Sequence, residues 1–158
     1  MKRRKIVLVI TMAAFSVATN LFAADDPFNG VWKLNAAKSK YTPGPGPQDE
    51  TVTVTGENGT HAVKFQVKTA EGETIEGGYT AKDDGTPAPL TGSPVADMIS
   101  VRKINDRTVE RRSMKAGKTV GQDRDTISPD GKTLTVTGSG LNQKGATGKY
   151  TVVFERQS

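Results

Sequence analysis

The sequence predicts an all-β protein, an up-and-down meander that closes into a barrel of about eight to ten antiparallel strands. Apolar and polar residues alternate through many short segments, and turn residues separate these segments at close intervals. No segment after residue 24 carries the apolar period of a helix. An open meander leaves unpaired strand edges, so closure into a barrel is the simplest arrangement.

Residues 1–24 are expected to be a cleavable signal peptide, outside the folded domain. Lys2 to Lys5 form a basic start, a mostly apolar stretch runs from Ile6 to Phe22, and Ala23-Ala24 follow it. The alternative is a membrane anchor, but polar residues interrupt the apolar run before it reaches the ~20 residues that a span needs. We therefore expect a periplasmic or secreted protein with one domain over residues 25–158 and no membrane span after cleavage.

The charge of the chain changes when the signal is removed. The 158 residues include 22 Lys and Arg against 17 Asp and Glu, a formal net charge of +5. Four of the basic residues lie in the signal and no acidic residue does, which lowers the net charge of the remainder to +1. We therefore expect no nucleic-acid partner. With no cysteine, stability must come from the core without disulfides.

The first strand is predicted at the run Phe28 to Asn35. Its alternation places Phe28, Gly30, Trp32 and Leu34 on one face. Glycine allows a close approach by another segment, and a tryptophan at this point suits the closed end of a small barrel. We expect Gly30 and Trp32 to form part of a structural plug at that end.

The remaining strands follow in order. They are predicted from residue 51 to the turn Glu57-Asn58-Gly59, then over 63–67, 75–82, 98–104, 108–114, 119–127, 134–136 and 150–154. A short additional strand is possible near Pro87 to Leu90. The two proline-rich stretches, Tyr41 to Gln48 and Gly85 to Pro94, are expected to be extended loops at the barrel rims.

Gly30-Val31-Trp32 near the start, with Arg156 near the end, resembles the calycin superfamily of lipocalins and fatty-acid-binding proteins. The resemblance implies that Trp32 packs against the basic Arg156 across the barrel base. The opening Phe-x-Gly-x-Trp-Lys-Leu-Asn also resembles a group of uncharacterised secreted bacterial proteins. These matches cover only the two ends of the chain.

Two departures from that family bear on function. Fatty-acid-binding proteins close with an Arg-x-Tyr pair that holds the carboxylate, whereas the matching positions here are the apolar Val152 and Phe154. The helical lid expected after the first strand is replaced by the Pro-Gly segment after Tyr41. The resemblance therefore implies the barrel without the fatty-acid chemistry.

No group of residues in the sequence has the pattern of a catalytic or metal site. His61 is the only histidine, lies beside a hairpin turn, and is expected to be exposed; a zinc site or a haem ligand is therefore not expected. Asp123 and Asp125 lack the ligand ladder of a calcium loop and are expected in surface ion pairs. Gly138-Ser139-Gly140 lacks the lysine of a phosphate loop. We predict no cofactor and no enzymatic activity.

The most unusual chemistry lies in the basic segment from Arg102 to Lys118. Exposure of all these charges on the outer face is one possibility. Alternatively, if Val109 and Val120 point inward, Arg111 points inward from one strand, and Gln122 and Arg124 do so from the next. Such a cavity would favour an anionic or strongly polar ligand.

Two functions remain open from these observations. The first is non-catalytic binding of a small amphipathic or anionic ligand by a monomer, with Arg111, Gln122 and Arg124 lining the site. The second is an envelope interaction or structural module whose barrel is filled by side chains. A hydrolase is a weaker third hypothesis. An interior volume of roughly 300 Å³ or more favours the first function.

Overall fold

The structure, a computed structural model, describes residues 26–142 and 144–158, and these consist almost entirely of antiparallel strands. The strands are β1 (Gly30–Leu34), β2 (Lys40–Thr42), β3 (Asp49–Glu57), β4 (Thr60–Lys68), β5 (Thr74–Lys82), β6 (Ala88–Thr91), β7 (Met98–Asn105), β8 (Thr108–Lys115), β9 (Lys118–Ile127), β10 (Thr133–Leu141) and β11 (Thr147–Arg156). A short 3-10 helix, η1 (Ala36–Lys38), joins β1 to β2. The predicted signal peptide lies outside the described residues.

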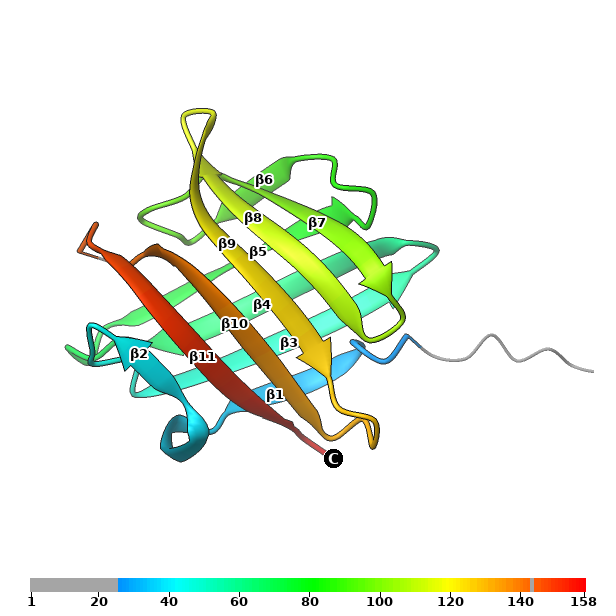
Figure 1. The fold of residues 1–158 in the computed structure, drawn as a ribbon, viewed down its shortest axis with the longest axis horizontal. Helices are drawn as coiled ribbons and strands as arrows, with labels where there is room; N and C mark the ends of the chain where they lie inside the picture. Colours follow the sequence, from blue (N-terminus) through cyan, green and yellow to red (C-terminus); the bar gives the residue numbers. More distant parts are fainter. Residues whose placement is uncertain (1–25, 143) are drawn as a thin grey trace, which may run out of the picture.

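Ten strands, β1 and β3 to β11, pair with their neighbours, and pairing of β1 with β11 closes them into a barrel (Figure 1). The predicted all-β up-and-down barrel is confirmed. β2 also pairs with β11, placing Tyr41 opposite Tyr150, so β1 and β2 follow β11 as two parts of one interrupted strand. The predicted rim loop after Tyr41 therefore begins with a short strand, and β6 corresponds to the additional strand expected near Pro87 to Leu90.

The turn between β3 and β4 has the predicted hairpin geometry. Asn58 and Gly59 both have positive φ, 52° and 73°, which a two-residue turn of the primed type requires. Asparagine and glycine tolerate this region best, and the right-handed twist of such a turn matches that of the strands it joins. β3 and β4 then pair without a register shift from Glu57 opposite Thr60 to Asp49 opposite Lys68.

Part of the apolar core closes the end of the barrel where the described chain begins. Trp32 is fully buried there, and it belongs to a cluster with Phe28, Ile127, Leu134 and Phe154. These residues come from β1, β9, β10, β11 and the segment before β1, so the cluster ties together strands that lie far apart in sequence. The loops at the other end of the barrel surround a cavity.

Candidate functional site

A cavity of about 490 Å³ opens between the loops at one end of the barrel and extends inward to Phe28 and Phe154. Its mouth is lined by residues 43–47, 69–71 and 92–95 and by the start of the β10–β11 connection. Two of these loops are joined by an ion pair of 2.7 Å between Lys144 Nζ and Glu71 Oε1. Trp32 is not among the lining residues and lies beyond the inner end of the cavity.

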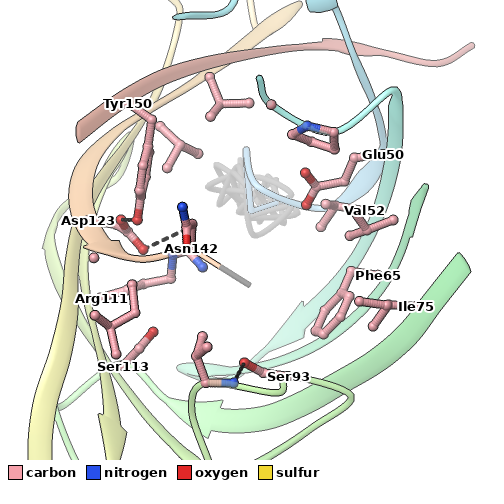
Figure 2. Close-up of a pocket in the computed structure, with 18 of the residues that line it drawn as sticks. Glu50, Val52, Phe65, Ile75, Ser93, Arg111, Ser113, Asp123, Asn142 and Tyr150 are labelled. Atoms are coloured by element: carbon pink, nitrogen blue, oxygen red, sulfur yellow. Dashed lines mark hydrogen bonds and ion pairs between the residues drawn. The ribbon is translucent and has the colours of Figure 1, made fainter. Parts of the chain in front are cut away.

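One wall of the cavity is apolar. Val52 on β3, Phe65 on β4 and Ile75 on β5 point toward the interior (Figure 2). All three are half-buried, because one side packs in the barrel wall and the other faces the cavity. Polar residues such as Lys64 and Gln66 alternate with them on the outer face, which is the pattern of a strand with one solvated side.

The opposite wall carries a cluster of buried polar side chains. Arg111 on β8 lies opposite Asp123 on β9 in the strand register, and Val109 lies opposite Asp125. Arg111 Nη2 donates a hydrogen bond to Asp125 Oδ1 at 3.2 Å and lies 3.4 Å from Asp123 Oδ2. The Tyr150 hydroxyl of β11 donates to Asp123 Oδ1 at 2.5 Å (Figure 2). One guanidinium is therefore shared between two carboxylates.

Burial and mutual charge set the protonation of this cluster. Burial alone would lower the pKa of Arg111, but Asp125 and Asp123 outweigh it and hold that pKa well above its ordinary value. Burial raises the pKa of Asp125 to about 6, although Arg111 acts in the opposite direction. Burial, followed by the charge of Asp123, raises the pKa of Tyr150, so its hydroxyl keeps its proton and remains a donor. Arg111 stays charged throughout the physiological pH range.

Glu50 enters the cavity from β3, beside Val52 (Figure 2). Its carboxyl group makes no hydrogen bond and no ion pair with any residue in the described ranges. Burial raises the pKa of Glu50 to about 7, with Arg111 lowering it and Asp49 raising it further. The hydroxyl of Tyr41 on β2 is also buried and lacks a hydrogen-bond partner in the part of the chain that the structure describes. Burial and then the charge of Glu50 raise the pKa of that hydroxyl.

Of the three residues predicted to line a ligand site, Arg111 lines the cavity, whereas Gln122 and Arg124 lie on the outer face of β9. The side chain of Arg124 is 57% exposed and pairs with Glu110 at 2.7 Å. The predicted inward orientation used Val120 as the interior residue of β9. The buried residues of this strand are instead Asp125 and Ile127. The pairing of β8 with β9 shifts register at Val120, so Val120 does not indicate which face the following residues occupy.

Asp123 and Asp125 are correspondingly on the inner face, which corrects the expectation that they form surface ion pairs. Gly138 on β10 makes room for Asp123, because a Cβ at this position would collide with Asp123 Oδ1. The sequence did contain a signal for Glu50: it precedes Val52 and Val54 at alternate positions and therefore shares their face.

His61 is buried, not exposed as expected from its place beside a turn. Its Nδ1 lies 2.7 Å from Asp83 Oδ1 and its Nε2 lies 3.1 Å from Asp26 Oδ2. Asp26 precedes β1 and Asp83 follows β5, so the histidine links two segments at the closed end. Because a carboxylate occupies each ring nitrogen, His61 has no nitrogen available to activate a nucleophile or bind a metal.

Arg156 lies over the indole of Trp32, with its guanidinium carbon 4.2 Å from the ring centroid. The guanidinium also donates to three backbone carbonyls, those of Pro27, Asn29 and Gly131. Gly30 has φ +137°, and a Cβ there would collide with Arg156 Nη1. Arg156 therefore closes the base of the barrel through stacking and backbone hydrogen bonds, and only glycine at position 30 leaves room for it.

Within residues 26–142 and 144–158, no cluster of three or more His, Asp or Glu side chains is placed to hold a metal ion. The same ranges contain no helix with the length and apolar character needed to cross a membrane.

No protein-family model matches the sequence, and a search of curated proteins found no match. Among solved structures, the chain is similar to zebrafish ileal bile acid-binding protein complexed with cholic acid. That similarity has a TM-score of 0.48 at 10% identity and covers 83% of this chain and 99% of the other. It is also similar to the siderocalin Ex-FABP, with a TM-score of 0.35 at 10% identity, covering 83% and 74% of the two chains.

Proposed function

We propose that this protein binds a small amphipathic molecule inside its barrel and does not transform it chemically. The observation that carries the proposal is the cavity of about 490 Å³. Small-molecule sites usually measure about 300–1,000 Å³, combine apolar walls with a few polar groups, and exist before the ligand arrives. This cavity meets each of those conditions.

The apolar wall and the polar wall of the cavity are the reason for proposing an amphipathic ligand. Val52, Phe65 and Ile75 offer apolar surface that is only half-buried without a ligand, and covering it is favourable by about 25 cal/mol per Å². Tyr150 and Arg111 on the opposite wall are already held by carboxylates, so their orientation is determined before binding. Preorganised polar groups reduce the entropy that a ligand must lose.

The alternative, an interaction or structural module, requires an interior filled by side chains, and the cavity favours ligand binding over it. The outer-face charges also favour the binding function. Arg102 and Arg124 share Glu110, and Lys103 pairs with Asp106, so part of the basic segment is neutralised by its own neighbours. The engagement of both nitrogens of His61 supports a non-catalytic role.

The proposal includes the cellular setting. We propose that residues 1–24 direct export and that the monomeric barrel acts in the periplasm or the medium, as the basic and then apolar start of the sequence indicates. Cell fractionation combined with amino-terminal sequencing tests this part. Retention of residues 1–24 on protein in the inner membrane would contradict it.

Native mass spectrometry of protein purified under mild conditions from its own cells tests the binding function. We expect a bound small molecule in the unmodified protein. Ser113→Phe fills the cavity from β8, and Arg112→Phe places the same aromatic side chain on the outer face of that strand. Loss of the bound mass in Ser113→Phe alone would place the ligand inside the barrel. Equal occupancy in both folded variants, or no bound molecule in the unmodified protein, would contradict the proposal.

A further inference from the structure

We propose that the preferred ligand carries a hydrogen-bond-donating cation, such as a protonated amine, which binds the carboxylate of Glu50 and the hydroxyl of Tyr41. The proposal rests on the binding function above and specifies the chemistry of the ligand's polar head. A cationic ligand differs from the anionic ligand that the sequence predicts on the assumption that Arg111 and Arg124 both point inward.

The charges of the interior are the first argument. Arg111 is the cation on the polar wall, and it is already shared between Asp123 and Asp125. Arg124 lies outside the barrel. Lys144 and Lys149 line only the mouth, where both are exposed, and Lys144 is paired with Glu71. Among the described residues, an anionic head inside the cavity would therefore meet no lysine or arginine other than Arg111, which is already paired with carboxylates, and it would lie near Asp123 and Asp125.

Glu50 provides the second argument. Glu50 is half-buried, and its carboxyl points into the cavity from the apolar wall and has no protein partner within the described residues (Figure 2). A carboxylate that is only partly solvated and has no protein partner is disfavoured, and a donor that pairs with it stabilises it. The hydroxyl of Tyr41 is also buried and unpartnered among the described residues, and it lies within the electrostatic reach of Glu50. A protonated amine has several N–H donors, so it can donate one hydrogen bond to the Glu50 carboxylate and another to the Tyr41 hydroxyl oxygen.

Protonation gives the interaction a pH dependence. The charged or titratable groups that act on Glu50 are Asp49 from its own strand, Arg111 from β8 and Tyr41 from β2. Burial raises the pKa of Glu50 to about 7, so in the empty cavity the carboxyl is mostly protonated below pH 7 and mostly ionised above it. Binding of a cation favours the ionised form and releases a proton. Affinity for an amine should therefore increase as the pH rises through 7.

Calorimetry with decylamine, decanol and decanoate, which share one chain and differ in the head, tests the proposal. At about pH 8, where Glu50 ionises readily, we expect decylamine to bind at least about tenfold more tightly than decanoate. Glu50→Gln should abolish this preference and leave decanol affinity within about twofold, because the cavity keeps its shape. Glu57→Gln, an exposed change on the same strand, is the matched control and should have no effect.

Equal or tighter binding of decanoate, or an unchanged preference in Glu50→Gln, would overturn the cation proposal while leaving ligand binding in place. Failure of all three probes, together with no co-purified molecule, would overturn the binding function as well. A pH series on the unmodified protein provides a second measurement that does not depend on folding of the variant. Decylamine affinity that does not fall below pH 7, relative to decanol, would also contradict the proposal.

Discussion

Arg111 and Asp123 lie directly opposite each other on β8 and β9, and both point into the barrel. Asp125, two residues further along β9, contributes the second carboxylate to the same guanidinium. A buried ion pair of this kind adds little net stability compared with apolar residues of similar size, but removal of one partner leaves an uncompensated buried charge. The cluster therefore makes the polar wall sensitive to single substitutions.

Arg111→Leu should lower the free energy of unfolding by about 3–5 kcal/mol, because it leaves Asp123 and Asp125 buried without a cation. Chemical denaturation of the purified variants measures this. Arg124→Leu is the matched control and should have a much smaller effect, since Arg124 is exposed. Adding Asp123→Asn and Asp125→Asn to Arg111→Leu should restore part of the loss. Equal effects of Arg111→Leu and Arg124→Leu would contradict the buried cluster.

Trp32→Ala should lower the free energy of unfolding by about 3–5 kcal/mol, because Trp32 is fully buried in the core. Arg156→Ala should cost less, and the double variant should lose less than the two single effects together, since the side chains are stacked. A double-mutant cycle by chemical denaturation provides the measurement. Strict additivity would indicate that the stacking contributes nothing to stability.

Glu50 should make stability decrease as pH rises. Its pKa is raised from 4.5 to about 7 in the folded protein, so its contribution is most favourable below pH 4.5 and is lost as pH rises through 7. The raised pKa of Asp125 also makes stability decrease as pH rises, in this case between pH 3.8 and about 6. Glu50→Gln should therefore gain on the order of 2 kcal/mol relative to the unmodified protein between acidic and mildly alkaline pH. Urea denaturation across this range is the test, and parallel pH profiles would contradict it.

Gly138→Ala should lower the free energy of unfolding by about 1–3 kcal/mol, because the added methyl group collides with the Asp123 carboxylate and with the backbone carbonyl of Gln122 on β9. Gly121→Ala on β9 is the matched control. A Cβ at Gly121 would have its nearest neighbours at 3.5 Å, an ordinary contact distance. Thermal denaturation of both variants distinguishes them, and a tolerated Gly138→Ala would show that Asp123 can move without cost.

The longer strands and their order were predictable from the sequence, whereas β2 was not. Alternation in segments such as Val63 to Val67 marks one buried face, and Asn58-Gly59 can form the tight turn that links β3 to β4 in register. Because short turns join most successive strands, each strand lies beside the next one and pairs with it. The up-and-down order of the strands therefore follows from the turns and the alternation in the sequence. The position of Trp32 near one end of the chain also indicated which strand would lie at the closed base.

Pairing with neighbouring strands, not the sequence of β9, determines which face of β9 is inside. Val120 lies where the register of β9 against β8 shifts, and alternation between the two faces is interrupted there. Val120 therefore does not indicate the orientation of the residues that follow it. The cross-strand pairing of Val109 with Asp125 does select one, and it turns Asp125 inward and Arg124 outward. The face of β9 that points inward therefore depends on its partner strand, and the periodicity of β9 alone carries no information about that partner.

The surroundings of His61 and Glu50 were likewise decided by contacts distant in sequence. His61 is buried because Asp26 and Asp83 reach it from segments before β1 and after β5. Glu50 shares a face with Val52, but whether that face meets packed side chains or open volume depends on how many strands close the barrel and how large the opposing residues are. Strand formation is local, whereas burial, ion pairing and the cavity are properties of the closed barrel.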